Sequence, residues 1–378
     1  MKKIFFIALL GLLSAPMMNA QEAAEEPQPK DWKWSGLVGL NANATGMVNW
    51  AAGGKNSVAG TVFGKVKLLY DKNSLSWETN LDVEYGMTYV DQPFDKVQKS
   101  SDHLKFDTKF GWAFKPHWYL TAQAGFHTQF DLGKKYTGTE ATNPIISNIL
   151  APSYTDISVG IDYKHSYKGA DFSLYLSPVA GRITTAYVSD KLNDEWADSY
   201  DLYPDGLRQS LQEANGCFHY DDDYTGGLVK KYDNAKAELG LTLKGGIAYT
   251  YKDFKLATNV TLFTPYAWDK TPLYEYVIID SDEEIVKHIY TKAQMEAKGI
   301  ALKDATYLGH RDNNRRFGNF DVDWDVLISY QFLKCLNVTL TTNLKYVNGL
   351  NIADSDGNHP CERVQFLANL GIGIGYSF

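Results

Sequence analysis

The sequence has few of the features that mark soluble enzymes or helical membrane proteins. After its first twenty residues it contains no long apolar run, and its mean hydropathy is −0.32. A membrane-crossing helix needs about 20 apolar residues, so helical spans are excluded. The 37 Lys and Arg residues form no long basic block and the net charge is −8, so no nucleic-acid partner is expected.

Catalytic and cofactor motifs are also missing from the chain. The mature sequence has no G-x-S-x-G, H-E-x-x-H, C-x-x-C or G-x-x-x-x-G-K-[ST] pattern, which are the usual signatures of nucleophile, zinc, redox and phosphate sites. We therefore expect no enzyme activity, no cofactor and no metal site.

The N-terminus has the pattern of a secretory signal. Lys2 and Lys3 precede an apolar run over residues 4–13, and small residues follow up to Ala20. The apolar run is too short for an N-terminal membrane anchor, and no Cys near Ala20 suggests a lipoprotein. We predict a signal peptide over residues 1–20 and an exported mature chain.

The main positive feature is a strict alternation of apolar and polar residues, which is clearest over residues 75–89. One face of this segment carries Leu75, Trp77, Leu81, Val83, Tyr85, Met87 and Tyr89. Strands of soluble sheets usually run about 5–6 residues, whereas tilted membrane-crossing strands need about 9–11. The length of the alternation therefore favours a transmembrane strand.

The same alternation recurs in twelve segments, an even number typical of bacterial barrels. The segments are 32–42, 58–70, 75–89, 104–114, 118–130, 157–163, 172–180, 237–251, 254–262, 320–332, 336–346 and 364–378. Hydrocarbon cannot pair backbone amides and carbonyls, so only a closed sheet can span it with strands. The predicted fold is all-β, a transmembrane up-and-down antiparallel β-barrel of about twelve strands. The alternative is a secreted β-sandwich or a soluble barrel with a buried final strand.

Connection lengths alternate as they do in outer-membrane barrels, with short periplasmic turns and long external loops. The short turns are 71–74, 115–117, 165–169, 252–253 and 333–335, and the long loops are 45–57, 90–102, 131–152, 188–232, 265–316 and 347–361. Both ends then lie in the periplasm. We predict a short periplasmic segment over residues 21–31 and one barrel domain over residues 32–378.

The C-terminus resembles the β-signal that the outer-membrane assembly machinery binds. Gly373, Tyr376 and Phe378 match the pattern, whereas Gly371 departs from its usual polar residue. Together with the signal peptide, this resemblance implies the cell outer membrane as the location. The expected partners are outer-membrane lipid and the assembly machinery.

Aromatic residues lie at many outward strand ends, and most of them cluster beside the predicted short turns, as in the interfacial girdle of a barrel. They are Trp32, Trp34, Tyr70, Tyr89, Trp112, Phe114, Trp118, Tyr163, Phe254, Tyr330, Phe332 and Tyr376.

The inward faces of the predicted strands are polar, with nearly balanced charge. The main network is Lys65, Lys67, Glu78, Asp82, Glu84, Lys105, Asp107, Lys109, Asp321, Asp323 and Asp325. A turn over residues 71–74 pairs Tyr70 with Leu75 and places Lys67 opposite Glu78. The three aspartates either pair with lysines, with Lys244 and Lys255 nearest along the chain, or form a cation site. The network either crosslinks a narrow lumen or lines a water-filled path.

The external loops carry the remaining candidates. Of 3 Cys residues, Cys217 and Cys361 lie in external loops while Cys335 lies in a periplasmic turn, so any disulfide joins Cys217 to Cys361.

The acidic segments 354–358 and 221–223 resemble cation loops only in part, and we interpret them as solvated. The loop 265–316 is predicted to hold a helix, with starts at Ser281 and Thr291 and a stop at Gly299. This helix either acts as a lid or ligand arm, or covers the barrel mouth by packing Ile285 and Ile289 downward.

Residues 49–57, with the pattern N-W-x-x-G-G-x-N-S, resemble a family of outer-membrane β-barrels of unknown function in Gram-negative bacteria. The strand from Trp77 to Gly86 and the segment 176–179, Leu-Ser-Pro-Val, extend the resemblance over most of the mature chain. The family implies a barrel and a location, with no substrate, reaction or catalytic residue.

Three functions follow from this prediction. The first is a channel or uptake protein for a small polar solute, based on the polar inward faces. The second is a structural or partner-binding surface protein with a closed lumen. The third is a lipid-modifying outer-membrane enzyme, whose catalytic groups would lie on the outer wall, with His117 or His127 beside a serine.

Overall fold

The computed structural model describes most of the chain after its N-terminal segment. The described residues are 31–45, 56–136, 144–200, 203–222, 228–266, 274–279, 287–290, 292–301, 306–310, 317–333, 336–348, 351–352 and 361–377. The predicted signal peptide and the segment 21–30 lie outside them. In the described part of the chain, no helix is both long and apolar enough to span a membrane.

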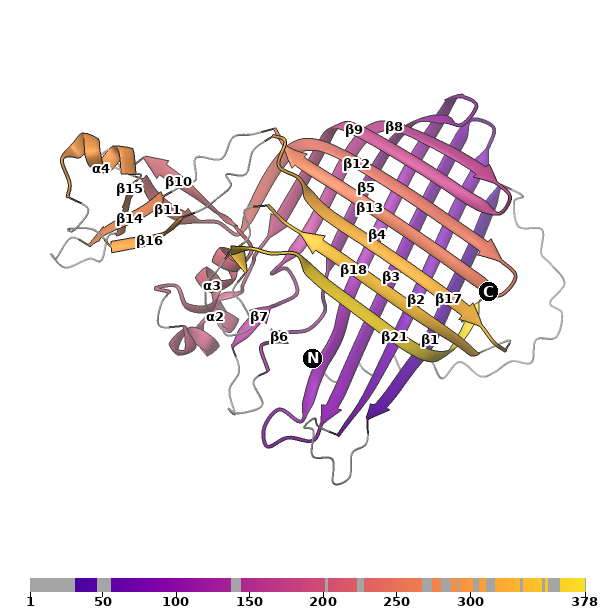
Figure 1. Cartoon of the computed structure of the whole chain (residues 1–378), viewed down its shortest axis with the longest axis horizontal. Helices are drawn as coiled ribbons and strands as arrows, with labels where there is room; N and C mark the ends of the chain where they lie inside the picture. The colour runs from indigo at the N-terminus through magenta and orange to yellow at the C-terminus, as the bar shows by residue number, and fades with distance from the viewer. Residues whose placement is uncertain are drawn as a thin grey trace.

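Twelve antiparallel strands form a closed barrel in which strands consecutive around the wall follow one another along the chain (Figure 1). They are β1 (Trp32–Thr45), β2 (Ser57–Lys72), β3 (Leu75–Val90), β4 (Val97–Lys115), β5 (Trp118–Thr128), β8 (Ser153–Tyr167), β9 (Ala170–Thr185), β12 (Ala235–Tyr251), β13 (Phe254–Pro265), β17 (Asp321–Gln331), β18 (Leu336–Tyr346) and β21 (Gln365–Ser377). Each overlaps one predicted segment, and the largest differences are at the start of β4, predicted at residue 104, and the end of β9, predicted at residue 180. The prediction of a twelve-stranded up-and-down barrel is confirmed.

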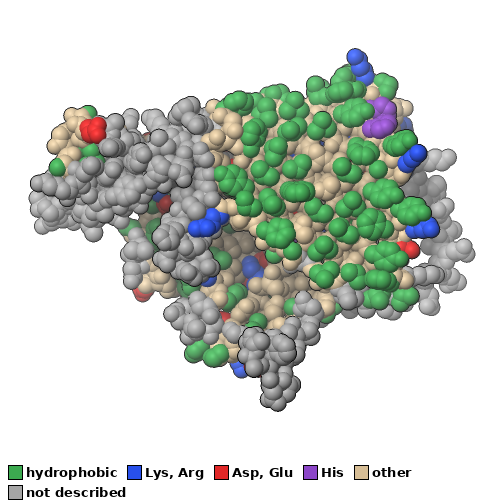
Figure 2. Space-filling model, in the orientation of Figure 1, with side chains coloured by type: hydrophobic (Ala, Val, Ile, Leu, Met, Phe, Trp, Pro, Cys, Tyr) green, Lys and Arg blue, Asp and Glu red, His purple; other side chains and the backbone are tan. Residues whose placement is uncertain are grey.

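The outer face of the barrel is apolar and exposed. Leu174, Leu239 and Ile157 are 54%, 54% and 55% exposed, although such residues are normally buried in soluble proteins. Hydrophobic side chains cover the visible wall as a broad belt (Figure 2). Soluble monomers rarely expose an apolar surface this large, and lipid admits closed barrels. The chain is therefore an outer-membrane β-barrel.

Aromatic pairs surround the short-turn end of the barrel, as predicted. The ring centroids of Trp32 and Tyr70 lie 4.8 Å apart, and those of Trp118 and Tyr163 lie 5.1 Å apart. Amphipathic rings of this kind settle where lipid meets water. The short turns therefore lie at one membrane boundary.

The register of the β2–β3 hairpin differs from the prediction by two residues. Tyr70 pairs with Trp77, and Lys72 pairs with Leu75 across a turn of only two residues. The turn is this tight because Asn73 adopts a positive φ of 55°, which Asn tolerates better than most residues.

Strand β9 contains a bulge that reverses its alternation. The ladder shifts between Val159 and Ile161 on β8, opposite the segment 177–178 of β9. Pro178 has no amide hydrogen for the ladder, which explains the break. Beyond it Val179 is 57% exposed, whereas Ala180 is buried and faces inward. The alternation of Phe172, Leu174 and Leu176 predicts that Ala180 also faces outward, and this prediction is wrong because of the bulge.

Parts of the external loops 131–152 and 188–217 form a small compact unit at the outer end of the barrel (Figure 1). We call it the cap; it contains β6 (Gly133–Lys134), β7 (Ile145–Ser147), α2 (Asp190–Trp196), the 3-10 turn Ala197–Ser199 and α3 (Gly206–Ala214). Its core consists of Ile145, Ala151, Val188, Tyr200, Leu207 and Leu211. The sequence analysis did not predict α2 or α3.

A five-stranded sheet extends outward from the cap. Its strands are β10 (Phe218–Asp222), β11 (Leu228–Tyr232), β15 (Lys287–Tyr290), β14 (Tyr274–Ile279) and β16 (Thr306–His310), and a short ladder joins β19 (Asn351–Ile352) to β20 (Cys361–Glu362). A helix, α4 (Lys292–Lys298), ends before Gly299, where φ is +68°, as predicted. The predicted helical position of Ile289 is wrong, because it pairs with Val277 in a strand. Ser281 and Ile285 lie outside the described residues.

Candidate functional site: the barrel lumen

A cavity of about 700 Å³ runs along the lumen. Its outer end is lined by Asn215, Gly216 and Phe218, which follow the cap helix α3, and its other end by Ser166 and Asp171 beside the β8–β9 turn. The space therefore extends from the cap to the periplasmic turns.

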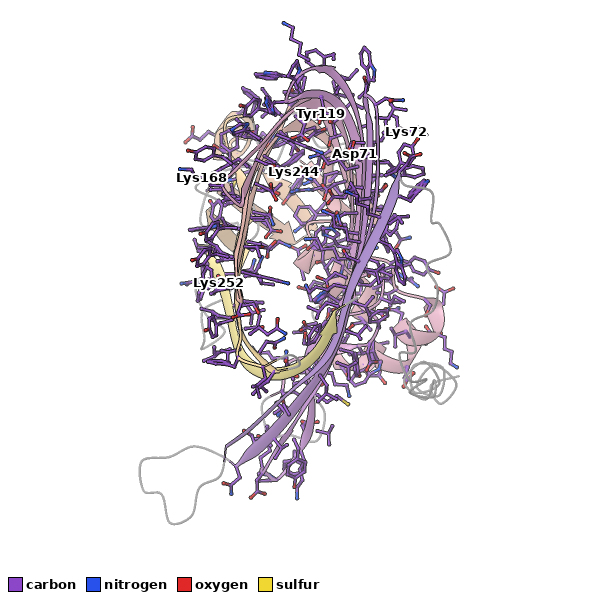
Figure 3. The ribbon with its side chains drawn as sticks, turned by 90° about the vertical axis from the view of Figure 1, so that its right-hand side faces the viewer. Asp71, Lys72, Tyr119, Lys168, Lys244 and Lys252 are labelled. Atoms are coloured by element: carbon purple, nitrogen blue, oxygen red, sulfur yellow. The ribbon has the colours of Figure 1, made fainter. Side chains whose placement is uncertain are left out.

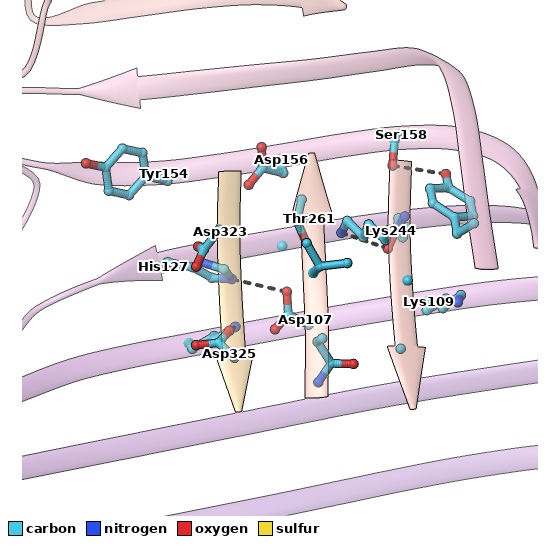
Figure 4. Close-up of a pocket in the computed structure, with 18 of the residues that line it drawn as sticks. Asp107, Lys109, His127, Tyr154, Asp156, Ser158, Lys244, Thr261, Asp323 and Asp325 are labelled. Atoms are coloured by element: carbon cyan, nitrogen blue, oxygen red, sulfur yellow. Dashed lines mark hydrogen bonds and ion pairs between the residues drawn. The ribbon is translucent and has the colours of Figure 1, made fainter. Parts of the chain in front are cut away.

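Charges of both signs line this cavity in equal number, with eight Lys or Arg and eight Asp or Glu residues. The inward faces carry them because side chains alternate across each strand and the outward positions are apolar. Figure 4 shows side chains from facing walls converging on one space. The side chains that line the cavity are therefore strongly polar, and their formal charges balance.

One ion pair joins opposite walls of the lumen. Lys105 lies on β4 and Asp325 on β17, with five strands between them in either direction around the barrel. Lys105 Nζ nevertheless lies 4.0 Å from Asp325 Oδ2. Seen from its end, the barrel is a flattened oval rather than a circle (Figure 3). The flattening brings the two walls within reach of a single lysine and a single aspartate.

The three aspartates of β17 are held by partners other than those predicted. Asp321 accepts a hydrogen bond from Arg182 Nη1 at 2.9 Å, and the Arg182 guanidinium also contacts Asp156. Asp323 and Asp325 each lie 2.8 Å from Asn343 Nδ2. The predicted pairing with a lysine is seen for Asp325, but its partner is Lys105 rather than Lys244 or Lys255, the nearest lysines along the chain. Proximity along the chain does not determine contacts across a lumen.

A basic cluster occupies the periplasmic half of the lumen. Lys109 Nζ lies 2.6 Å from Asp162 Oδ2, and Lys164 Nζ lies 3.7 Å from the same oxygen, although Asp162 is fully buried. Lys244 donates to Gln123 Oε1 at 3.1 Å. A buried carboxylate between two ammonium groups is stabilised by both, which offsets the cost of its desolvation.

A second set of predicted charges lies on β2, β3 and β4. Lys65 binds Asp82, which also lies 3.3 Å from His103 Nε2, and the Glu84 carboxylate accepts from Ser101. Lys67 is not directly opposite Glu78, yet their charged atoms lie 3.0 Å apart along a diagonal. These contacts tie neighbouring strands together.

The two histidines considered as catalytic candidates are not on the outer wall. His127 faces the lumen, where its Nε2 lies 3.2 Å from Asp107 Oδ1. His117 lies in a periplasmic turn and its Nδ1 is 3.0 Å from the Lys164 carbonyl oxygen.

Within the described residues, no cluster of His, Cys, Asp or Glu has the arrangement of a metal site. In the segment 221–223, Asp221 pairs with Lys231 at 2.9 Å. The acidic segment 354–358 lies outside the described residues, as does most of the motif 49–57.

Cys217 is a free and fully buried thiol, so the predicted disulfide with Cys361 is not formed. Its Sγ lies 3.5 Å from the Thr184 carbonyl oxygen. Burial raises the pKa of this thiol to about 11. Cys361 is placed in β20, and Cys335 lies outside the described residues.

The predicted assembly signal lies on the closing strand. Gly373 pairs with Asn41 and Tyr376 pairs with Val38, so both positions belong to the β21 edge that meets β1. Phe378 lies outside the described residues. Binding by the assembly machinery stays a prediction.

A family model described as "Protein of unknown function (DUF3078)" matches residues 42–133, which is less than half of the chain. The match agrees with the resemblance to barrels of unknown function. No curated protein matches the sequence.

Solved outer-membrane proteins share the barrel architecture at low similarity. A NanC porin is 8% identical with a TM-score of 0.33, covering 90% of this chain and 98% of that one. An outer-membrane channel from Pseudomonas putida F1 is 10% identical with a TM-score of 0.33, covering 94% and 98%. The TodX monoaromatic hydrocarbon channel is 10% identical with a TM-score of 0.31, covering 92% and 89%. Values this low transfer no substrate.

Proposed function

We propose that this barrel is a channel for small polar solutes. The observation that carries the proposal is the cavity that runs from the cap to the periplasmic turns and is lined by sixteen charged side chains. Charged groups that line an empty space remain hydrated, so water and small polar solutes can replace one another along it. A barrel of about twelve strands also falls between the filled eight-stranded and the open porin-like sizes.

The balance of charge defines the solute class. Eight positive and eight negative groups give the lumen no overall preference for one ion sign, while the basic cluster and the β17 aspartates lie at different depths. A zwitterionic solute carries both charges and meets both groups on its way through. Neutral polar solutes are the second expected class, and bulky ones are blocked where Lys105 and Asp325 meet.

Uptake into vesicles tests this function. Purified barrel in liposomes is diluted into an isotonic solution of glycine, and the rate of swelling is followed by light scattering. Glycine should enter much faster than a tetrasaccharide. Liposomes whose swelling matches protein-free controls for every solute would contradict the proposal.

A closed structural barrel is the second candidate, because the Lys105–Asp325 pair crosses the lumen and the cap lies over its outer end. The same swelling experiment separates the two. If the barrel is a channel, replacing Lys105 should increase the rate of liposome swelling. If the barrel is sealed, the rate should stay at that of protein-free liposomes.

A further inference from the structure

The barrel is closed by a seam that is paired over only part of its length. β1 pairs with β2 over fourteen residues and β21 pairs with β18 over ten, but β1 and β21 pair over five, from Leu37 with Ser377 to Asn41 with Gly373. In the described chain, the segment 365–372 of β21 forms no ladder with β1. If the register continued, residues 369–372 would pair with residues 42–45 of β1, but these described residues form no ladder. Within the described chain, this stretch of β21 is therefore paired only with β18.

The two strands separate just above the last paired residues. A Cβ atom added to Gly371 would lie 3.4 Å from the Asn41 side chain, so the strands are still close at that level. Farther out, β21 and β1 diverge, and the inner faces of strands on the far wall are visible between them (Figure 1). In the same orientation, Figure 2 shows a hollow at the outer edge of the hydrophobic belt.

The free part of β21 has apolar residues at its outward positions and one apolar residue, Leu367, among its inward positions. Phe366 and Leu370 point outward and are 67% and 68% exposed, among the most exposed large hydrophobic residues described. Leu367 points into the lumen, since its cross-strand partner Asn343 contacts Asp323 and Asp325 there, and it is 58% exposed. Other lumen-facing positions also hold apolar residues, such as Phe263, which packs against the Arg182 guanidinium. Leu367 differs from Phe263 in its exposure, since Phe263 is buried.

Unpaired backbone groups at this edge cannot face hydrocarbon alone, since each would cost several kcal/mol. These backbone groups need water or a polar group beside them, while Phe366, Leu367 and Leu370 need an apolar partner. An amphiphile supplies the polar group and the apolar partner in one molecule. The edge matches an amphiphile, with its hydrocarbon chain on the three side chains and its polar head toward the charged lumen.

We propose that the gap between β1 and β21 is a lateral opening through which an amphiphile with one polar head and a hydrocarbon chain passes between the outer leaflet and the lumen. The head reaches a lumen that already holds both signs of charge, including Lys65, Asp82 and His103 on the wall that continues from β1. This inference goes beyond the proposed channel, because it gives the lumen a second entrance from the lipid.

Quenching by lipid tests the opening directly. Cys217, Cys335 and Cys361 are replaced by Ala, and a single bimane-labelled cysteine is introduced as Leu367→Cys in bilayers of phospholipid brominated on its acyl chains. Two matched positions calibrate the result. Leu370→Cys faces the lipid, and Ser173→Cys faces the lumen behind a fully paired wall.

The opening predicts that the Leu367→Cys label loses most of its fluorescence, as the Leu370→Cys label does, while the Ser173→Cys label stays bright. A Leu367→Cys label as bright as that of Ser173→Cys would overturn the proposal, because acyl chains would then not reach the lumen side of the seam. Solute swelling is measured on the same vesicles. Failure of the channel and failure of the opening are thereby distinguished.

Photo-crosslinking identifies the occupant. A free fatty acid and a phospholipid, each with a diazirine in its chain, are supplied in separate experiments. Adducts on the peptide that carries Phe366 and Leu370 should exceed those on Leu174 and Leu176 of the sealed wall severalfold with at least one probe, and the comparison of probes names the source. Equal labelling around the belt with both probes would contradict a specific amphiphile site.

Discussion

The barrel wall and the cap place their apolar side chains in opposite environments, outside the sheet in the wall and inside the core in the cap. In the wall, Leu174 and Leu239 point outward and the charges point inward, whereas in the cap Leu207 and Leu211 are fully buried. The difference lies in the solvent, because the wall faces hydrocarbon and the cap faces water. The same residue type thus stabilises one region by exposure to lipid and the other by burial in protein.

The largest expected effect is a break in the cap core. Leu211→Ala leaves a cavity beside Leu207 and should lower the local stability of the cap by about 2–5 kcal/mol. Protease cleavage within residues 188–217 should become much faster, while the heat-modifiable gel mobility of the barrel is unchanged. Tyr187→Ala, at an exposed site in the same loop, is the control. Simultaneous loss of barrel and cap would show that the two regions do not differ as described.

The folding free energy of the barrel wall should depend on the charge of its outward side chains more than on their volume. Leu176→Arg places a cation in the middle of the apolar belt, where the cost is about 2–4 kcal/mol of folding free energy in a bilayer. Ser173→Arg, on the lumen face of the same strand, should cost much less. Urea titrations of folding into liposomes compare the two variants. Equal costs would mean that lipid does not solvate the outer face.

Cys217 reports whether the cap stays closed. Its raised pKa of about 11, compared with an ordinary 9.0, reduces the thiolate at neutral pH about 100-fold. In a background with Cys335→Ser and Cys361→Ser, maleimide labelling should be at least that much slower than for a free thiol, and should accelerate in Leu211→Ala. Fast labelling of the unaltered cap would contradict its compact packing.

The smallest expected effect is a pH dependence in the stability of β10 and β11, two strands of the five-stranded sheet outside the cap. Asp233 and Asp221 raise the pKa of the His219 imidazole above its usual 6.5, through hydrogen bonding first and charge second. Because the folded state binds the proton more tightly, this stabilisation is fully present below pH 6.5 and is lost as pH rises through the raised pKa. The protection factors of amides in β10 and β11, which correct for the intrinsic rise of exchange with pH, should fall over that window, and His219→Gln should abolish this fall. The contribution is at most about 1 kcal/mol, since the pair is exposed.

The strands could be predicted from the sequence because the period of two repeats in every wall segment, as in residues 75–89. The register could not, because it depends on the positive φ of Asn73, and the facing of Ala180 depends on the bulge at Pro178. The Asn73 turn and the Pro178 bulge change the backbone only locally, so the alternation of apolar and polar residues on either side of them gives no sign of them.

The candidate site was predictable in composition but not in contacts. The inward charges follow from the alternation, and most of the predicted network lines the cavity. Arg182 and Asp321 lie 139 residues apart in the chain, and no sequence pattern relates them. The helices α2 and α3 were missed because each is short and shares its apolar residues with the core of the cap.

The most direct test of the water-filled lumen is single-channel conductance across planar bilayers for the wild type, Lys105→Ala, Asp325→Ala and the double variant. We predict a small wild-type conductance that rises in each variant, with a shift toward cations in Lys105→Ala and toward anions in Asp325→Ala. Lys231→Ala, outside the lumen, should change neither. Conductance at background in all four lumen proteins would contradict a continuous path.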